Sequence, residues 1–338
     1  MIREAIAALV EGRSLSGEEA ASVMGEIMSG EATPAQVGAF LTAMRMKGET
    51  AEEIAGMARV MREKALRVHA TGRVVDTCGT GGDAKGTFNI STAAAFVVAA
   101  SGLKVAKHGN RAASGTVGSA DVLEAAGVKI DLKPPGVQRC LEEVGIGFMF
   151  AQVFHPAMRH VAGPRREMGI RTVFNILGPL TNPAGAQVQV LGVADGALGE
   201  KMARVLQLMG VERALVVHGE DGLDELTTTG PSRVWDAQGG SVRSYTVTPE
   251  EVGLPRAVPE ALKGGGSREQ HLAMLRGVLA GQPGAPLDVV LLNAGAAIMA
   301  GGVSRDLKEG VARARQAVES GAAAARLEAL IKLSQGLE

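Results

Sequence analysis

The sequence has few cysteine and aromatic residues. Its 338 residues include two cysteines, one Trp, one Tyr and seven Phe. Two cysteines are too few for a disulfide framework or a zinc cluster, and this low number fits a reducing compartment. We therefore expect a cytoplasmic protein. Cys78 is expected to be a small packing residue, although it lies beside a glycine-rich stretch.

The sequence also lacks an excess of charge of one sign. It has 35 Lys plus Arg and 36 Asp plus Glu, for a formal net charge of -1. This balance gives no support to binding of nucleic acid or of an acidic membrane surface. The longest apolar stretch, near residue 288, is too short to span a membrane and contains Asn293. We expect neither a nucleic-acid nor a membrane partner.

Several familiar catalytic motifs are missing, namely GxSxG, HExxH, CxxC and the Walker A loop. What is present is DTCGTGGDAKGTFNIST, residues 76–92, in which Gly79, Gly81, Gly82 and Gly86 alternate with polar residues. An apolar run precedes these glycines, and a helix is expected to begin near Ser91. Because glycines let successive backbone N–H groups converge on one point in front of a helix N-terminus, this stretch predicts a phosphate pocket.

The chain divides into a helical opening and a longer α/β part. Residues 1–68 predict four helices, because Ser16 with Glu19, Thr33 with Gln36 and Thr50 with Glu53 form capping boxes. After residues 69–72, apolar strands and helices alternate, which predicts a mostly parallel sheet flanked by helices. We expect a small α-helical domain at 1–68, completed by helices from about 155–185, and an α/β domain at 73–338. Expected strands are 73–77, 103–109, 128–132, 146–150, 188–194, 214–220 and 288–294, with a peripheral excursion at 230–265 and mainly helix after Arg268.

A second polar cluster, KHGNRAASGTVGSADVLEAAG, spans residues 107–127. Lys107 and Arg111 supply positive charge, and His108 and Asn110 supply hydrogen-bonding groups, at the end of a predicted strand. Ligands of open α/β sheets bind at strand ends near a switch point. A solvated basic turn explains Lys107 or Arg111 singly, but it explains the full set poorly. Two such loops suit a ligand with two separated phosphate groups.

Two further clusters carry charge. Arg159, Arg165, Arg166 and Arg171 lie within thirteen residues, and one of them is a candidate to hold a substrate carboxylate. The alternative for each is a solvated helix face. Asp224 and Glu225 are adjacent carboxylates in a glycine-bounded loop, and a cation would relieve their repulsion. Oxygen ligands without His or Cys favour magnesium over zinc, whereas an isolated pair would be an ordinary acidic turn.

Six segments, in order, resemble the anthranilate phosphoribosyltransferase family over nearly the whole chain. They are GTGGD (79–83), NIST (89–92), KHGNRAASGTVGSADVLEA (107–125), HPAMR (155–159), RTVFNILGPLTNP (171–183) and GLDELTTTGP (222–231). The resemblance implies a homodimer formed through the helical part. It also implies transfer of the phosphoribosyl group of phosphoribosyl pyrophosphate to the amine of anthranilate, with Mg²⁺ as cofactor, in tryptophan biosynthesis.

The resemblance assigns roles residue by residue. Lys107, Asp224 and Glu225 are implied to be catalytic, and Ser91, Asp224 and Glu225 to bind magnesium. Asn110 and Arg165 are implied to bind anthranilate, with Gly79 between the two substrates and His108 beside the acceptor path. The implied phosphoribosyl pyrophosphate site comprises Gly79, Gly82, Asp83, Thr87, Asn89, Ile90, Ser91, Thr92, Lys107, His108, Gly109, Asn110, Arg111, Ala112, Ala113, Ser114, Gly115 and Ser119.

Two alternatives stay open at this point. A pyrimidine nucleoside phosphorylase has a similar fold and a segment like SGTVGSADVLEA, but it would use free phosphate and would not need the Asp224–Glu225 pair. A non-catalytic relative that binds nucleic acid would have a basic excess and eroded motifs, neither of which the sequence contains. TTTGPS, after the acidic pair, is interpreted as a variation in a tolerant loop.

Overall fold

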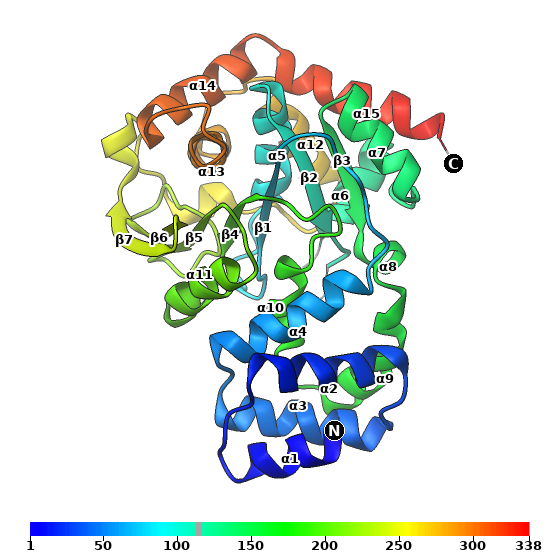
Figure 1. Ribbon diagram of the computed structural model, residues 1–338. Helices are drawn as coiled ribbons and strands as arrows, with labels where there is room; N and C mark the ends of the chain where they lie inside the picture. The colour runs from blue at the N-terminus through cyan, green and yellow to red at the C-terminus, as the bar shows by residue number, and fades with distance from the viewer. Residues whose placement is uncertain (113–116, 338) are drawn as a thin grey trace.

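A computed structural model describes residues 1–112 and 117–337 of the chain. Its helical opening contains α1 (Ile2–Val10), α2 (Gly17–Ser29), α3 (Pro34–Lys47) and α4 (Ala51–Glu63), drawn in blue in Figure 1. The three predicted capping boxes are confirmed, because each hydroxyl accepts from the backbone N–H three residues on and each Glu or Gln accepts in return.

Glu53 joins three parts of this helical bundle. Its buried carboxylate accepts hydrogen bonds from the backbone N–H of Leu15 at 2.8 Å and of Thr50 at 2.7 Å. It also pairs with Lys47 Nζ at 2.9 Å. The start of α4 is thereby tied to the end of α3 and to the loop before α2. Since a buried charge is costly without partners, these bonds explain how Glu53 is tolerated in the core.

The α/β part is built on a seven-stranded sheet in the order β3-β2-β1-β4-β5-β6-β7. The first five strands run parallel, and β6 and β7 form an antiparallel hairpin at one edge. The predicted mostly parallel sheet is therefore confirmed. The bounds are β1 (Val74–Gly79), β2 (Lys104–Gly109), β3 (Ile146–Phe150), β4 (Val188–Gly192), β5 (Arg213–Gly219), β6 (Ser232–Gln238) and β7 (Ser241–Val247).

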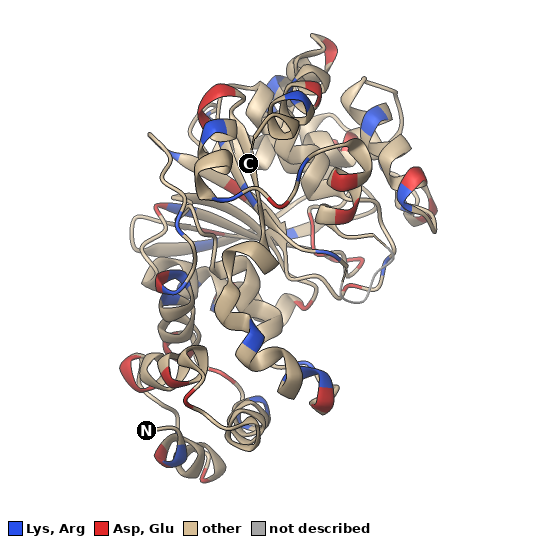
Figure 2. Ribbon diagram, turned by 90° about the vertical axis from the view of Figure 1, so that its right-hand side faces the viewer, with Lys and Arg blue, Asp and Glu red and all other residues tan. Residues whose placement is uncertain are grey.

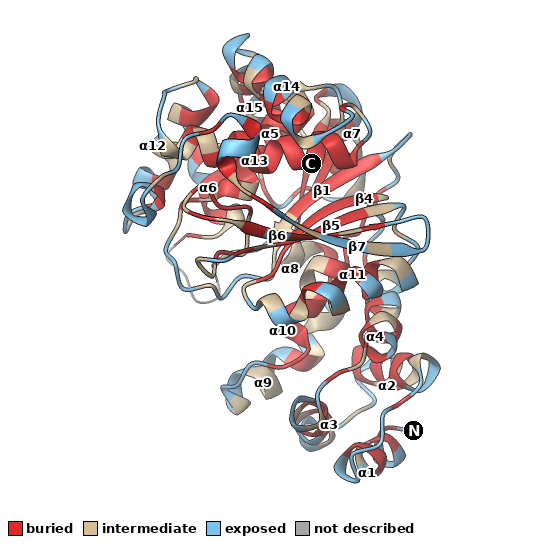
Figure 3. Cartoon of the chain, turned by 90° about the vertical axis from the view of Figure 1, so that its left-hand side faces the viewer, coloured by how far each residue is buried: buried red, intermediate tan, exposed pale blue. Residues whose placement is uncertain are grey.

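Helices cover both faces of the sheet. Figure 3 shows one layer above it and α11 with α10 below it. The upper layer contains α5 (Ile90–Ala100), α6 (Ser119–Ala126), α7 (Pro134–Glu143), α12 (Arg268–Leu279), α13 (Ala285–Ala300), α14 (Leu307–Glu319) and α15 (Ala322–Gln335). Below lie α8 (Ala151–Phe154), α9 (Arg159–Met168), α10 (Phe174–Leu177) and α11 (Gly199–Leu208). Short 3-10 helices occur at Pro156–Met158, Gly178–Leu180, Gly196–Leu198, Pro249–Val252 and Pro259–Leu262.

The core has two apolar clusters, one on each side of the sheet. The upper cluster includes nearly all of α5 and α13. The lower cluster joins α1–α4 with Val161 and Phe174, and it continues into α11 and the underside of β4 and β5. The helical bundle and the sheet thus share one continuous buried surface. Charged residues of both signs are interspersed over the outer helices (Figure 2), in keeping with the net charge of -1.

Two expected strands are wrong. Residues 288–294 lie inside α13, because a continuous apolar run can be a buried helix as well as a buried strand. Residues 128–132 form a turn between α6 and α7, just before Pro134 and Pro135. The peripheral excursion expected at 230–265 contains β6 and β7, which extend the main sheet at one edge. No helix within 1–112 or 117–337 has the length and apolar character needed to cross a membrane.

Candidate active site

Four parallel strands end in glycine at one edge of the sheet. These residues are Gly79 of β1, Gly109 of β2, Gly192 of β4 and Gly219 of β5. The strand order reverses between β1 and β4, and Gly79 and Gly192 are direct partners across that boundary. Ligands of open α/β sheets bind outside the carboxyl ends of the strands at such a switch point. This edge is therefore the candidate site.

Gly79 and Gly192 make room for the loop that follows β5. A Cβ on Gly192 would lie 1.6 Å from the carbonyl oxygen of Asp224, and one on Gly79 would lie 2.2 Å from Asp224 Oδ2. Neither position can carry a side chain while the loop keeps its place. The backbone N–H of Gly81 donates to Asp224 Oδ2 at 2.7 Å. Sequence reasoning missed Gly192, because the strand was expected to continue to residue 194 whereas β4 ends at Gly192.

Three carboxylates gather at this edge. Burial, and then the charge of Asp83, raises the pKa of Asp224 to about 7. Burial, and then the charge of Asp224, raises the pKa of Glu225 well above its usual range. Asp83 Oδ2 is buried and has no hydrogen-bond partner among the described residues. Like charges held together in this way favour either proton uptake or a cation.

The available ligands fit a magnesium ion bound jointly by the protein and by substrate phosphates better than a metal ion bound by protein side chains alone. Within the described part of the chain, no group of three or more His, Cys, Asp or Glu side chains is arranged to hold a metal ion. Magnesium is commonly bound by one or two carboxylates together with substrate phosphates. A pair of half-buried carboxylates beside a phosphate loop has that composition.

Lys107 lies beneath the glycine loop. Its side chain is 3% exposed and donates to the Thr77 carbonyl at 2.7 Å and to Ser91 Oγ at 3.2 Å. Burial lowers the pKa of Lys107, and the nearby Asp76 carboxylate opposes this shift. Asp76, which sequence reasoning missed, accepts a 2.8 Å hydrogen bond from Asn182 Nδ2 in the core. The cation thus lies under the N-terminus of α5, where the phosphate pocket is predicted.

The glycine loop itself has an unusual backbone. Gly81, Gly82, Ala84 and Gly86 all have positive φ angles. A Cβ on Gly82 would lie 1.9 Å from Arg171 Nη1, so the guanidinium of Arg171 packs directly on the loop. This conformation turns the loop around at the end of β1, as the glycine pattern predicts.

A distant segment supports the same loop. Thr87 forms an isolated antiparallel bridge with Lys263, and the Gly264 N–H donates to the Gly86 carbonyl at 2.9 Å. Asn89 Nδ2 donates to the Val117 carbonyl at 3.0 Å, and Asn89 Oδ1 lies 2.8 Å from His271 Nδ1. The Asn89 side chain therefore fixes the loop to its neighbours. Ile90 and Thr92 are buried in the first turn of α5.

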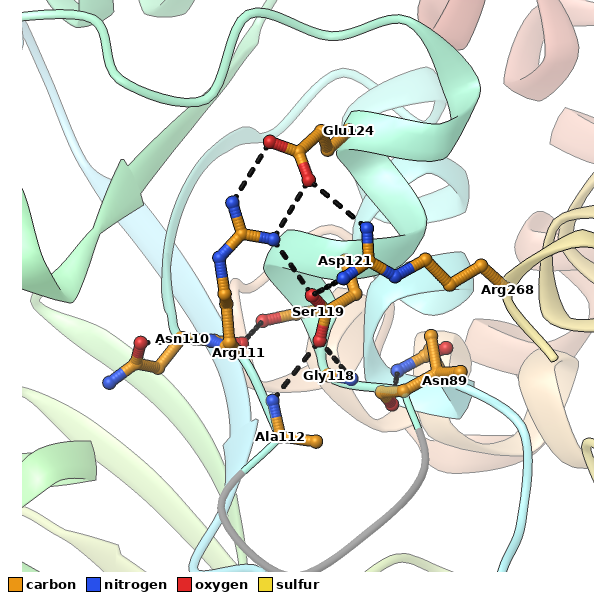
Figure 4. A network of polar contacts seen from close by, with 10 residues as sticks. Asn89, Asn110, Arg111, Ala112, Gly118, Ser119, Asp121, Glu124 and Arg268 are labelled. Carbon is orange, nitrogen blue, oxygen red and sulfur yellow. Dashed lines mark hydrogen bonds and ion pairs between the residues drawn. The ribbon is translucent and has the colours of Figure 1, made fainter. Parts of the chain in front are cut away.

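Arg111 of the second loop is held by ion pairs (Figure 4). Its guanidinium contacts Asp121 at 2.8 Å and Glu124 at 2.8 Å and 2.9 Å, and Arg268 pairs with the same two acids. Asp121 also accepts from the backbone N–H of Ala112 and Gly118. Arg111 thus fastens this loop to α6.

The other predicted residues of the second loop lie around this network. Asn110 Oδ1 accepts from the Arg111 N–H at 2.8 Å, and Ser119 Oγ donates to the Asn110 carbonyl at 3.3 Å. A Cβ on Gly109 would lie 2.2 Å from Ser119 Oγ, so this glycine allows Ser119 to approach β2. Ala113, Ser114 and Gly115 lie outside the described residues.

Two neutral histidines pack together near Lys107, namely His108, the next residue in sequence, and His155, which follows α8. The rings of His108 and His155 are 4.9 Å apart. Burial, and then proximity of His155, lowers the pKa of His108 to about 3. Burial also lowers the pKa of His155 to about 4. Near neutral pH neither ring carries charge, so this part of the site is polar but uncharged.

Among the four clustered arginines, Arg165 is half-buried. Its guanidinium lies 5.2 Å from the centre of the Phe174 ring, and burial lowers its pKa. Within the described residues no acid pairs with it, whereas Arg166 is exposed. Among the described residues, no hydrogen bond or ion pair joins Arg165 to Asp224 or Glu225. A partly desolvated guanidinium without a carboxylate is suited to binding an anionic ligand.

A groove of about 480 Å³ lies elsewhere, between α2, α4 and α11. Its lining includes Arg59, Arg62, Glu52 and Met209, and none of the predicted site residues. Arg59 pairs there with Glu18, and Arg62 donates to the Leu180 carbonyl at 2.8 Å. The phosphate loop and the acidic pair lie at the strand ends instead, so we assign the chemistry to that edge.

Comparison with known proteins agrees with this fold. Residues 3–65 match the model of the glycosyl transferase family helical bundle domain, and residues 71–324 match that of the glycosyl transferase family a/b domain. An anthranilate phosphoribosyltransferase of Chloroflexus aurantiacus is 60% identical over 337 residues, which is 99% of each chain.

Solved structures give the same result. The anthranilate phosphoribosyltransferase of Thermus thermophilus superposes with a TM-score of 0.93 at 50% identity, covering 98% of this chain and 99% of that one. The Saccharomyces cerevisiae enzyme in complex with PRPP and Mg has a TM-score of 0.91 at 27% identity, covering 99% and 98%. These matches favour phosphoribosyl transfer over the nucleoside phosphorylase alternative, and the chain belongs to the anthranilate phosphoribosyltransferase family.

Proposed function

We propose that the strand-end edge is where this chain transfers the phosphoribosyl group of phosphoribosyl pyrophosphate to the amine of anthranilate. The products are N-(5-phosphoribosyl)anthranilate and pyrophosphate. The observation that carries the proposal is the convergence of the glycine loop, Lys107 and the Asp224–Glu225 pair at the ends of β1, β2 and β5. A phosphate pocket, a cation and a magnesium-type carboxylate pair are the groups that departure of pyrophosphate requires.

For the donor we propose two kinds of residue. We propose that backbone N–H groups of Gly79, Gly82 and the first turn of α5 bind the phosphates, together with Asp83, Thr87 and the loop that begins at Lys107; Ala113, Ser114 and Gly115, assigned to the donor by the resemblance, lie outside the described residues. Asn89 and Arg111 instead hold the two loops in place, because their side chains are already hydrogen-bonded or ion-paired. Ser119 supports the second loop through the Asn110 carbonyl.

Ser91, Asp224 and Glu225 are the proposed magnesium ligands. The support is the chemistry of the donor set, namely two half-buried carboxylates with raised pKa values beside a hydroxyl at a helix N-terminus. The yeast relative in complex with PRPP and Mg is consistent with this role. A bound magnesium ion neutralises negative charge on the departing pyrophosphate.

The residues of this chain act by position and charge. As the bond to pyrophosphate lengthens, the ribose carbon becomes oxocarbenium-like, and Lys107 beneath the loop stabilises the negative charge that moves onto the leaving group. The aryl amine of anthranilate attacks from the opposite face. This amine is unprotonated at neutral pH, so no strong base is needed and no covalent intermediate forms.

For the acceptor we propose Arg165 and Asn110. Arg165 would hold the anthranilate carboxylate, since it is a half-buried guanidinium without an acidic partner in the described part of the chain. Gly79 lies between the two substrates. His108 lines the acceptor path as a neutral ring, because its pKa of about 3 prevents it from being a charged group near neutral pH.

Three broader proposals accompany this assignment. The chain divides into a helical domain at 1–68, completed by residues of about 155–185, and an α/β domain at 73–338. The support is the lower apolar cluster, which joins α1–α4 with Val161 and Phe174. We also propose a homodimer formed through the helical domain and a cytoplasmic location, the latter supported by two cysteines without a disulfide.

The experiment that tests the reaction follows anthranilate fluorescence in the presence of phosphoribosyl pyrophosphate, with and without magnesium. We expect loss of signal only when protein, donor and metal are all present. A flat trace from folded protein would reject the proposal. Phosphorolysis of pyrimidine nucleosides, assayed with the same preparation, would then support the phosphorylase alternative.

A further inference from the structure

The helix α13 contains one buried polar side chain in an otherwise apolar run. Asn293 is 2% exposed, and its neighbours from Val289 to Met299 are all buried and apolar. A buried amide without partners costs free energy, and Asn is a weak helix former. Its presence there depends on the hydrogen bonds that it makes.

Asn293 makes two of these hydrogen bonds with the loop that carries Asp224 and Glu225, called the acidic loop below. Its Oδ1 accepts from the Leu226 N–H at 3.0 Å, and its Nδ2 donates to the Leu226 carbonyl at 2.8 Å. Nδ2 also donates to the Val289 carbonyl, one turn earlier in α13, at 2.9 Å. Both donors and the acceptor of the amide are used. One side chain therefore binds both polar groups of the residue directly after Glu225, as a neighbouring strand would.

The far side of the loop is anchored as well. Asp221 Oδ2 accepts from the hydroxyls of Thr227 at 2.8 Å and Thr229 at 2.6 Å, and Asp221 Oδ1 accepts from the Leu223 N–H at 3.1 Å. The Thr227 N–H donates to Ser232 Oγ at 2.9 Å. The TTT segment, interpreted from the sequence as a tolerant variation, is an ordered part of this structure.

The loop needs such anchors because it holds charges of one sign together. Asp224 and Glu225 lie side by side, with Asp83 close enough to repel Asp224. Gly192 permits the close approach of the Asp224 backbone to β4 but makes no bond that would keep it there. A backbone free to move would let the carboxylates separate, and their geometry as ligands would be lost.

We infer that Asn293 is a positioning residue, which holds the Asp224–Glu225 carboxylates in place through both polar groups of Leu226. The inference rests on the proposed function, since it assigns those carboxylates to magnesium and pyrophosphate. Residues that orient metal ligands without touching the metal typically change metal affinity 10–100-fold when they are replaced.

The test compares Asn293→Leu with Leu291→Ala. Leucine has the same number and branching of side-chain heavy atoms as asparagine, although it is larger, and it makes none of the three hydrogen bonds. Leu291 is fully buried on the opposite face of α13, at a helical rotation of 100° per residue, so its truncation reports the effect of a weakened helix alone. Asn293→Ser, whose hydroxyl cannot reach both groups of Leu226, replaces Asn293→Leu if the latter does not fold.

Two readouts separate positioning from stability. The first is amide hydrogen exchange of the peptide containing Leu226, which does not depend on catalysis. The second is the magnesium concentration that gives half-maximal activity, measured beside the KM for anthranilate. For Asn293→Leu we expect faster exchange at Leu226 and an increase of about tenfold in the magnesium requirement, with an anthranilate KM within about twofold of the native value.

Leu291→Ala should lower the melting temperature and leave both readouts unchanged. The inference is overturned if the amide exchange rate at Leu226 and the magnesium concentration for half-maximal activity are the same in Asn293→Leu and Leu291→Ala. The proposed function and the role of Asn293 can fail separately. If the proposed function is wrong, Asp224→Ala with Glu225→Ala will leave the magnesium requirement of the otherwise native chain unchanged. Amide exchange at Leu226 will still depend on Asn293 in that case.

Discussion

Single side chains in the candidate site differ in whether their charge already has a partner. Arg111 is paired with Asp121 and Glu124, whereas Arg165 lies over Phe174 without an acid among the described residues. The sequence presents both as arginines in motifs and does not distinguish them. Residues elsewhere in the chain decide which arginine is ion-paired. The sequence could therefore identify both arginines as candidates but could not show which one is free to bind a ligand.

Arg165 allows a direct test of the acceptor site. Arg165→Ala should raise the anthranilate KM about 10- to 100-fold, because a charge-assisted hydrogen bond to a carboxylate contributes about 1.5–3 kcal/mol. Steady-state kinetics with anthranilate varied at saturating donor measure this effect. Arg166→Ala, at the exposed neighbouring position, is the control and should change the KM little. An unchanged KM in Arg165→Ala would remove this residue from the site.

The buried histidines predict how stability depends on pH. In the unfolded chain a histidine binds a proton below about pH 6.5, whereas native His108 and His155 have pKa values of about 3 and about 4. Between those limits the unfolded state binds more protons, so these groups lower the free energy of unfolding as pH falls from about 6.5 towards 4. The loss is about 1.4 kcal/mol per pH unit for each histidine.

Urea unfolding at pH 7 and pH 5 measures this loss. Asp76 and Asp224, whose pKa values are raised, act in the opposite direction, so the comparison must be between variants. His155→Gln should lose about 2 kcal/mol less than the native protein over this range, since it lacks one titrating group. Equal losses in the two proteins would contradict the low pKa of His155.

At the level of helices and strands, local signals predicted much of what is found. The capping boxes at Ser16, Thr33 and Thr50 mark helix starts because both partners lie within four residues. The run at 288–294 was wrongly predicted as a strand, because apolar continuity does not distinguish a buried helix from a buried strand. The partners of Asn89 and Asn293 could not be predicted, since they come from distant parts of the chain.

The close contact between Gly192 at the end of β4 and the backbone of Asp224 can be tested directly. Gly192→Ala would place a methyl group 1.6 Å from the Asp224 carbonyl oxygen, and backbone cannot yield as a flexible side chain can. We expect a loss of about 1–3 kcal/mol in stability from overpacking. We expect a fall of about 100-fold in kcat/KM, because displacement of a positioned group by about 1 Å has effects of that size.

Thermal unfolding and steady-state kinetics check both effects of Gly192→Ala. Gly230→Ala is the matched control, because a Cβ at Gly230 meets nothing within 4 Å and its φ is not positive. This control should keep native stability and activity. Native kinetics in a folded Gly192→Ala protein would show that the acidic loop need not approach β4 so closely.

At the scale of the whole molecule, α1 and α3 lie at the end that carries the N-terminus, away from the sheet (Figure 1). Val10 is 73% exposed and Met46 is 83% exposed, and both lie in the helical bundle. Exposed apolar side chains of this kind are expected where a second copy packs. If the helical domain forms the dimer, Val10→Asp with Met46→Asp should shift sedimentation towards the monomer. A native chain that sediments as a monomer at all concentrations would reject the dimer.

We expect Asp224 and Glu225 to serve the reaction while lowering the free energy of unfolding of the native protein. Their raised pKa values mean that ionising them favours the unfolded state. Asp224→Asn with Glu225→Gln should therefore keep, or slightly increase, the melting temperature at pH 8 without magnesium. The same variant should lose at least about 100-fold in magnesium-dependent turnover, since the charges that bind the metal are gone.

The most direct measurement is a magnesium titration of anthranilate consumption, followed by fluorescence, for the native protein and for Asp224→Asn with Glu225→Gln, with melting temperatures recorded in parallel. We expect the native protein to require magnesium. We expect the variant to fold with a melting temperature at least as high as that of the native protein and to be nearly inactive at every magnesium concentration. A folded variant with native turnover and a native magnesium requirement would contradict this expectation.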